Sequence, residues 1–535
     1  MGGNLPFELI REIAQYRWRD PQAFLTKYAL VCRQWQAAFE PFIYDKICIH
    51  SEDFKTEKGA ISLARAEALT SNSHHAVARR TMIREILYRV ILPFSLPDYH
   101  SLKSRTPEQT YTPHNATRQA NNEAFEAGTL KLFNFLSSIN AASRVTLRIE
   151  TLAREDGHEP GTEVFLDSWG RPDEARGKSV VRPYRAEFAD PPCPLPPVPC
   201  VDRLIADNSW YVFDKGPYYA PHLDCKHIRL ETACYIAQAC PTLSYFRWEC
   251  DDPARPEHLD YARERREAFA ASLLKLPATL RRFDLSSLTA EVLHDSLPAP
   301  ALCPDGNDIL STNLRYITLG LQELFLYEVP LANDFLCPLD NSGEPCGDWD
   351  STEWPNLEEI SISCSNFLPS GEWLHDPSLT SEDPGIDIDA LTNDPDFDYE
   401  EEVYRLVGDD VYYSRSVLKT ELYLLANISL GYAARRMPRL RSMWFRYSHD
   451  RDVTMEFWKE EKERKAEATL MWTEGVHGDF DEEADGHGNG NGARNRPDER
   501  VARAWQFELE DLESEVVEGK RVSKLTLSSK MPSDR

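Results

Sequence analysis

The chain has 535 residues, of which 41% are hydrophobic and 11% are aromatic, and its formal net charge is −28 at pH 7. This length predicts about two to four domains, and the hydrophobic content is that of a globular protein with a packed core. The excess of acidic residues argues against general binding to nucleic acid or to an anionic membrane, and weakly favours partners with basic patches.

Residues 1–20 carry no signal peptide, and no apolar run in the chain is long enough to span a bilayer. We therefore expect a soluble protein of the cytoplasm, the nucleus or both, without membrane contact. The twelve cysteines are scattered and form no CxxC pair. We expect reduced, mostly buried thiols rather than a zinc site or a disulfide framework.

The first fifty residues contain the most informative pattern. Pro6 suits the first turn of a helix, because its missing N–H and fixed φ cost nothing there. The apolar residues that follow recur at helical spacing and form one stripe; they are Leu9, Ile10, Ile13 and Tyr16. A second helix is predicted from Phe24, Leu25, Tyr28 and Val31. A third is predicted from Trp35, Ala38, Phe39 and Phe42, and we expect Pro41 to end or disturb it.

A unit this short cannot bury enough apolar surface to be stable alone, so it needs a partner or a neighbouring domain. Its three helices could simply pack on one another. However, Tyr28, Cys32 and Trp35 are large or soft residues within a few turns, and interfaces favour Trp and Tyr anchors. We interpret the unit as a binding module rather than a catalytic one.

Over roughly residues 4–50 the chain resembles an F-box, in particular those of filamentous fungi. The likeness is most specific at Leu5-Pro6, Glu8, Leu9, Ile13 and the Val31-Cys32-Arg33-x-Trp35 cluster. The stretch 17–20 departs from the family, which often has a Leu-Pro-type turn there. The resemblance implies docking onto Skp1, and through it onto cullin-1. The residues that it assigns to the Skp1 contact are Leu5, Pro6, Leu9, Ile13, Val31, Cys32 and Trp35.

After this module one apolar-x-x-apolar-x-apolar pattern returns, and its alternation predicts strands. The matches are Tyr44/Ile47/Ile49, Leu87/Val90/Leu92, Ala142/Val145/Leu147, Cys225/Ile228/Leu230, Leu243/Phe246/Trp248, Leu280/Phe283/Leu285, Leu314/Ile317/Leu319, Leu357/Ile360/Ile362, Leu440/Met443/Phe445 and Val522/Leu525/Leu527. Helical segments precede several of them, and a Pro often stands at the junction. Leu321/Leu324/Leu326 also fits, but it lies too close to Leu319 for a separate turn.

This outline resembles a degenerate leucine-rich repeat, in which parallel strands stack with helices outside. The spacing is irregular, because successive matches begin 18, 37, 34 and 83 residues apart at Cys225/Leu243, Leu243/Leu280, Leu280/Leu314 and Leu357/Leu440. The alternative is an irregular α/β domain with a non-repeating sheet. The predicted fold class is α/β, with a three-helix F-box (1–50) followed by an irregular leucine-rich-repeat-like solenoid (51–530).

Four insertions are expected to be loops or disordered: residues 98–122, 154–200, 376–410 and 474–499. Within the first two we expect a polar loop and an extended proline-rich stretch at 190–199. Residues 376–410 hold thirteen acidic residues and one basic residue, Arg405. This acidic insertion is interpreted either as a solvated tether or as a contact for a basic partner.

No catalytic motif is present. The Gly177-Lys178-Ser179 sequence lacks the upstream glycine of a phosphate-binding loop, since position 172 is Pro. Asp387 and Asp389 begin like a calcium loop but lack its later Gly and Glu. We therefore expect no catalytic residue, no metal and no cofactor.

These observations favour a non-catalytic substrate-recognition subunit of an SCF-type (Skp1–cullin–F-box) ubiquitin ligase. The N-terminal helices would bind Skp1, and the repeat domain would bind a protein target whose identity the sequence does not reveal. The alternative is a scaffold protein, Skp1-bound or free, without a role in ubiquitin transfer. An enzyme of unknown type is the third possibility.

Overall fold

The computed structural model describes residues 5–18, 25–54, 60–71, 74–96, 101–102, 112–157, 159–160, 162–163, 182–189, 192–206, 228–250, 258–287, 298–347, 349, 352–377, 415–448, 453–462, 465–475, 497–517 and 520–527. The chain is mixed α/β, and most of its sheet structure is parallel. Its internal contacts define two compact units, each described by itself. Unit 1 is Met1–Glu163, Pro183–Glu249 and Lys275–Leu280; unit 2 is Val164–Arg182, Cys250–Leu274 and Arg281–Arg535. Residue 50, the predicted domain boundary, lies within unit 1.

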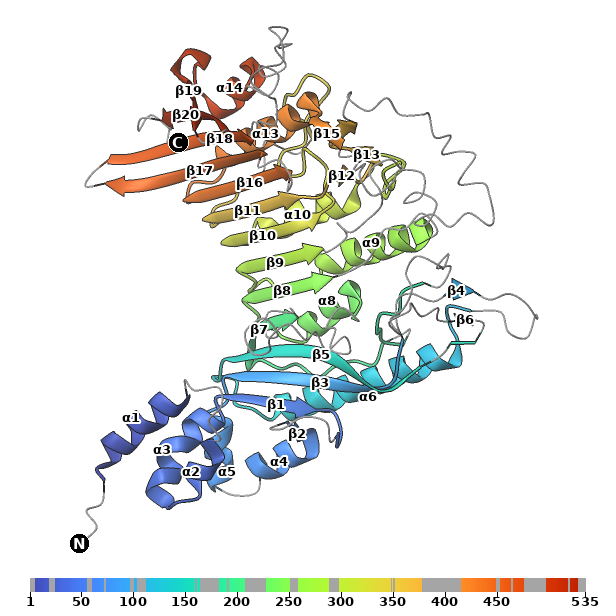
Figure 1. The fold of residues 1–535 in the computed structure, drawn as a ribbon, viewed down its shortest axis with the longest axis vertical. Coiled ribbons are helices and arrows are strands. Elements are labelled where there is room, and N and C mark those ends of the chain that lie inside the picture. The colour runs from blue at the N-terminus through green and yellow to red at the C-terminus, as the bar shows by residue number, and fades with distance from the viewer. Residues whose placement is uncertain are drawn as a thin grey trace, which may run out of the picture. The chain divides into compact units, whose positions relative to one another are not determined.

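Three helices open unit 1 and pack around a small apolar core (Figure 1). They are α1 (Phe7–Trp18), α2 (Leu25–Ala29) and α3 (Arg33–Ile43), which confirms the three predicted helices. Val31, predicted within the second helix, lies beyond its end at Ala29. Phe24 lies outside the described residues. The core consists of Ile10, Ala14, Ala38 and Phe39. α3 continues beyond Pro41, contrary to expectation, because a proline near the last turn removes one backbone hydrogen bond without ending the helix.

This helical module is joined to the rest of unit 1 in two ways. α3 leads through a short turn directly into β1 (Lys46–His50). The Arg79 guanidinium, on α5 (His74–Arg80), lies 2.6 Å from the Glu40 carboxylate of α3. The same guanidinium lies 5.3 Å from the centre of the Tyr44 ring. Burial raises the pKa of Tyr44, and the Arg79 charge partly opposes that rise.

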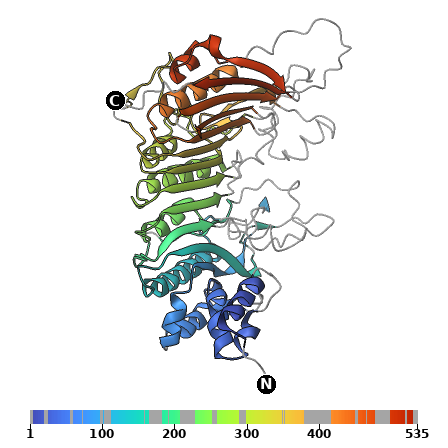
Figure 2. The ribbon, with the colours of Figure 1, turned by 90° about the vertical axis from the view of Figure 1, so that its left-hand side faces the viewer.

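The strands of unit 1 form parallel pairs. In sheet order they are β2 (Ile61–Ser62), β1, β3 (Glu85–Ser95), β5 (Val145–Asp156), β7 (Val201–Ala206) and β8 (Tyr245–Cys250). The connecting helices are α4 (Leu63–Ser71), α5, α6 (Ala116–Ser137) and α8 (Leu230–Gln238). Figures 1 and 2 show α6 and α8 along one face of these strands. Against that face, the Tyr88 hydroxyl donates a hydrogen bond to the Gly128 carbonyl at 2.7 Å.

One apolar position recurs in register from strand to strand of unit 1. Its residues are Ile47, Ile86, Leu147, Leu204 and Phe246. Where β3 and β5 begin, a backbone amide donates to a carbonyl of the preceding turn: Arg84 N–H donates to the Asp45 carbonyl at 2.9 Å, and Thr146 N–H donates to the Arg84 carbonyl at 2.8 Å. Each of these turns therefore supplies a hydrogen-bond acceptor for a backbone N–H group of the next one.

Unit 2 shows the same arrangement in β9 (Arg282–Ser287), β10 (Glu323–Val329), β11 (Glu359–Cys364) and β16 (Ser442–Ser448), which are parallel. The buried residues Phe283, Leu324, Ile360 and Met443 share one register position. The helices are α9 (Leu259–Leu273), α10 (Ile309–Thr318) and α13 (Thr420–Ala434). Gln322 N–H donates to the Arg281 carbonyl at 2.7 Å, and Glu358 N–H donates to the Gln322 carbonyl at 2.8 Å.

The last part of unit 2 changes to antiparallel pairing. Its strands, in sheet order after β16, are β17 (Val453–Lys462), β18 (Lys465–Gly475), β20 (Lys520–Leu527) and β19 (Glu513–Val517). α14 (Glu499–Trp505) packs on α13 around Asn427. Trp472 Nε1–H donates to the Asn427 side-chain oxygen at 3.0 Å, and Trp505 Nε1–H donates to its backbone carbonyl at 3.0 Å.

Short antiparallel pairs complete the described structure. They are β4 (Ser101–Leu102) with β6 (Thr162–Glu163), β12 (Phe367–Leu368) with β13 (Glu372–Trp373), and β14 (His375–Pro377) with β15 (Arg415–Leu418).

The predicted strand pattern is confirmed at some matches and wrong at others. The matches that begin at Tyr44, Leu243, Leu280, Leu357 and Leu440 lie in parallel strands at the common register position. The match at Leu314 is wrong, because its residues form α10 and the end of that helix. The adjacent Leu321/Leu324/Leu326, which the spacing argument sets aside, forms β10 and is buried.

Four further matches need correction. Leu230 begins α8, and Cys225 lies outside the described residues. The neighbouring strand, β7, has no counterpart among the predictions.

In β3 and β5 the common position is Ile86 and Leu147, so the matches Leu87/Val90/Leu92 and Ala142/Val145/Leu147 are out of register. The match at Val522 lies in β20, which pairs antiparallel.

The expected insertions are partly folded. Residues 116–122, predicted as loop, belong to α6, since the Asn115 side chain caps the helix by accepting from Thr117 N–H and Arg118 N–H. Within 154–200, Tyr184, Ala186 and Val198 are buried. The acidic residues 378–410 and residues 476–496 lie outside the described part of the chain.

A close contact in unit 2 predicts that Gly431→Ala is destabilising. A Cβ at Gly431 would lie 2.6 Å from Trp505 Cδ1, and Trp505 is fully buried. Overpacking typically costs about 1–3 kcal/mol, more than the roughly 1 kcal/mol that alanine gains over glycine in a helix. We expect a lower midpoint of thermal unfolding for Gly431→Ala. Gly320→Ala, whose Cβ would have only one neighbour at 3.9 Å, is the control and should unfold like the parent chain.

Candidate functional site

The apolar residues of α1 divide between two sides of the helix. Ile10 and Ala14 are buried in the module core. Leu9 is 44% exposed, and Leu5, just before the helix, is 43% exposed. The helical spacing of Leu9, Ile10, Ile13 and Tyr16 predicts a single apolar stripe. The structure instead shows a buried side that holds the module together and a second apolar side that faces away from the core.

The second side of α1 forms one wall of an open groove of about 350 Å³. Its lining consists of Leu5, Leu9, Glu12, Ile13 and Tyr16. The groove thus combines apolar side chains with a single carboxylate. Such a surface suits the apolar face of a partner protein, because burial of apolar area stabilises the contact by about 25 cal/mol per Å².

A second exposed apolar region lies at the turn between α2 and α3. Leu30 is 86% exposed and Val31 is 62% exposed, and Cys32 is also exposed. Because these two aliphatic side chains bury little apolar surface within the module, they contribute little to its stability. Exposed apolar groups that recur on one small module indicate a protein interaction surface.

Trp35 packs on two aromatic rings of the module. Its ring stacks on Phe39, with centroids 5.5 Å apart, and lies 6.2 Å from the ring of Tyr28. Trp35 is half-buried and packs against the module core. It therefore supports the three-helix packing, and any contribution to a partner contact is confined to its exposed part.

Of the seven residues assigned to the Skp1 contact, the structure gathers Leu5, Leu9 and Ile13 at the groove. Pro6 is exposed immediately before α1, where its carbonyl accepts from Ile10 N–H at 3.2 Å. Val31 and Cys32 lie at the other exposed region, and Trp35 belongs mainly to the core.

The sequence patterns did not indicate that two apolar residues, Tyr16 and Leu30, are strongly exposed. Tyr16, 75% exposed, was assigned to the helix stripe and Leu30 was not singled out. The position of Tyr16 three residues after Ile13 could have placed it on the outer side of α1. Leu30 carried no such periodic signal, because it lies in the turn after α2 rather than in a helix.

Among the described residues, no group of three or more His, Cys, Asp or Glu is arranged to hold a metal ion. Of the ten cysteines whose surroundings the structure describes, only Cys200, Cys234, Cys240 and Cys337 are buried; five are half-buried and Cys32 is exposed, so the expectation of mostly buried thiols is wrong. Burial raises the pKa of Cys200 to about 11, so this thiol stays protonated and weakly nucleophilic at neutral pH. Among the described helices, none is long and apolar enough to cross a membrane.

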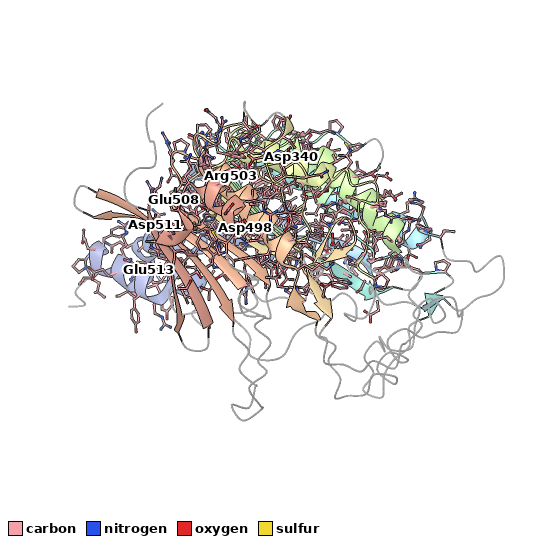
Figure 3. The ribbon with its side chains drawn as sticks, turned by 90° about the horizontal axis from the view of Figure 1, so that it is seen from above. Asp340, Asp498, Arg503, Glu508, Asp511 and Glu513 are labelled. Atoms are coloured by element: carbon pink, nitrogen blue, oxygen red, sulfur yellow. The ribbon has the colours of Figure 1, made fainter. Side chains whose placement is uncertain are left out.

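An acidic surface lies near the end of unit 2. Figure 3 shows Glu508, Asp511 and Glu513 together after α14, and these side chains are exposed. Close by, Arg503 pairs with Glu344. Hydrogen bonds from the Ser342 hydroxyl and neighbouring backbone amides lower the pKa of Asp340, although its side chain is fully exposed. The cluster is interpreted as a solvated face that contributes to the net charge.

Neither the protein-family models nor the curated proteins with which the chain was compared show a match. The functional assignment therefore depends on the N-terminal residues and on the surfaces that the structure forms from them.

Mutation can distinguish residues that stabilise the module from residues that are exposed on its surface. Trp35→Ala removes the stacking on Phe39 and should destabilise the module by about 1–3 kcal/mol, less than for a fully buried aromatic. Leu9→Glu, at an exposed position, should change its stability by no more than about 0.5 kcal/mol. Hydrogen exchange of the α3 amides in the full chain measures both effects. Equal protection in Trp35→Ala and the parent chain would contradict the structural role of Trp35.

Proposed function

We propose that the chain is a substrate-recognition subunit of an SCF-type ubiquitin ligase. The N-terminal three-helix module would be an F-box that binds Skp1. The observation that carries the proposal is the exposed apolar groove of α1, because its lining residues Leu5, Leu9 and Ile13 are also those at which the sequence resembles an F-box. The exposed Leu30 and Val31 support it as a second contact region.

The Skp1 contact would be mainly hydrophobic. Burial of an exposed Leu or Val side chain contributes roughly 1.5–3 kcal/mol. Because Leu5 and Leu9 are already about half-buried, each would add roughly half of this amount, and the more exposed Leu30 and Val31 would add more of it. The module would be prepared for binding, since the core of Ile10, Ala14, Ala38 and Phe39 fixes the helices before the partner arrives.

The rest of the chain would be an irregular leucine-rich-repeat-like solenoid that holds the target protein. Three structural features support this interpretation. Successive strands are parallel, one apolar position stays in register, and helices such as α9 and α10 precede their strands along one face. Such repeats leave the other face of the strands free for recognition.

Ubiquitin transfer would then be catalysed by other subunits. This chain would contribute by holding the target close to the transfer site, which raises the effective concentration of the reacting lysine. The proposal therefore needs no nucleophile, metal or cofactor in this chain.

Capture of purified Skp1 by the tagged full-length chain tests the proposal. We expect Leu9→Glu and Val31→Glu each to weaken binding at least tenfold, because a carboxylate would be buried against an apolar partner. Val77→Glu is the matched control. Val77 is 54% exposed on α5, outside the proposed contact, and its variant should bind Skp1 like the parent chain.

Two outcomes of this experiment decide between functions. Undiminished Skp1 binding by the double variant Leu9→Glu/Val31→Glu, with normal thermal unfolding, would contradict an F-box. If Skp1 binds but cullin-1 is absent from the captured complex, the chain is a Skp1-bound scaffold without a ligase role.

A further inference from the structure

The strands of unit 2 present a second surface on the face opposite to their buried register position. In β17, Met455 and Phe457 are buried, and Phe457 packs on Trp505 of α14 with ring centroids 5.9 Å apart. Glu456 lies between them in sequence and therefore points to the other face of the strands. We call this face of β10, β11, β16, β17 and β18 the open face.

A mainly apolar row crosses the open face at one register position. From β10 to β18 the aligned residues are Phe325, Ser361, Trp444, Glu456 and Met471. All five are half-buried. With adjacent strands about 4.8 Å apart, the row spans roughly 19 Å, the length of about six extended residues.

Among these five residues Glu456 is the only ionisable one, and the same register position continues to Asp284 on β9 and to Lys524 on β20. It lies directly opposite Trp444 on one side and Met471 on the other, so each of these side chains has its Cβ about 4.5–5.5 Å from that of Glu456. Burial raises the pKa of Glu456, and no neighbouring charge offsets that rise. In the part of the chain that the structure describes, no Lys or Arg pairs with Glu456 and no cation covers the Trp444 ring.

Elsewhere on the same face, an aromatic ring and a neighbouring carboxylate already bind a cation. The Arg282 guanidinium lies 4.3 Å from the centre of the Phe325 ring. It also lies 2.6 Å from the Glu323 carboxylate. An aromatic ring next to a carboxylate thus binds an arginine within the protein itself. Trp444 and Glu456 form an equivalent pair, and tryptophan is the ring that attracts cations most strongly.

We propose that the open face binds a polypeptide segment of a partner protein through a lysine or arginine side chain held between the Trp444 ring and the Glu456 carboxylate. The small Ser361 beside Trp444 leaves space for the aliphatic part of that side chain, and Phe325 and Met471 contact flanking apolar residues. This inference rests on the proposed receptor function, because it names the class of target.

Charge complementarity favours a basic polypeptide over other occupants. The chain carries a net charge of −28, which draws basic segments toward it and repels nucleic acid. On the open face, Arg282 is already paired with Glu323, whereas Glu456 is not paired. An unpaired, half-buried carboxylate gains most from an incoming cation because little water screens the pair.

A selection from a random twelve-residue peptide library on phage tests this proposal with the immobilised full-length chain. We expect enrichment of peptides with a Lys or Arg flanked by apolar residues. For an enriched peptide made synthetically, fluorescence anisotropy should show at least fivefold weaker binding when its basic residue is replaced by Gln. Binding should also weaken as salt concentration rises.

Variants of the chain locate the contact. Glu456→Gln keeps the shape of the side chain and should weaken peptide binding at least fivefold, and Trp444→Ala should weaken it at least as much. Glu510→Gln removes one charge from an exposed position outside the open face and is the matched control. It should bind the peptide like the parent chain.

Three results would overturn the proposal: no enrichment of basic peptides, equal binding by Glu456→Gln and the parent chain, or self-association of the chain that Glu456→Gln abolishes. The last result would identify a second copy of the chain as the occupant. Leu9→Glu should bind the peptide normally, so failure of the Skp1 contact and failure of the open face are distinguishable.

Discussion

The fold depends on backbone hydrogen bonds between successive turns of the chain. The amide just before a strand donates to a carbonyl of the turn before it, as Gln322 does to Arg281 and Glu358 does to Gln322. Beside these bonds, residues such as Leu324 and Ile360 bury their side chains in register. A single turn satisfies neither its polar nor its apolar groups, so stability belongs to the series of turns.

The same dependence explains how the N-terminal module can keep apolar groups on its surface. Its core of Ile10, Ala14, Ala38 and Phe39 is too small to be stable alone. Support comes from the direct passage of α3 into β1 and from the Glu40–Arg79 ion pair. Because unit 1 helps to hold the helices, Leu9 and Val31 are not needed for folding and remain exposed.

Local patterns predicted the three helices and the strands that begin after a Pro-x-Leu junction, because their signals lie within a few residues. The template gave a wrong assignment at Leu314, because Leu314 and Ile317 are one helical step of three residues apart and Leu319 is the residue at which the helix ends. Exposure could not be predicted for Trp35, because it depends on which side of α3 packs on the other helices, or for Leu30, because it lies in a turn with no periodic pattern. The row around Glu456 required the pairing of β16, β17 and β18, which no local pattern contains.

The two proposed surfaces differ in the physical basis of binding. The groove of α1 offers aliphatic side chains, whose burial is not weakened by the screening of charges and needs no charged partner. The open face instead combines Trp444 with the carboxylate of Glu456, so its affinity depends on a cation and on ionic strength. A hydrophobic contact suits a partner that stays bound, and a single charge-assisted contact suits one that is exchanged. The proposed receptor function would need this division, because its adaptor would stay constant and its targets would have to be released after modification.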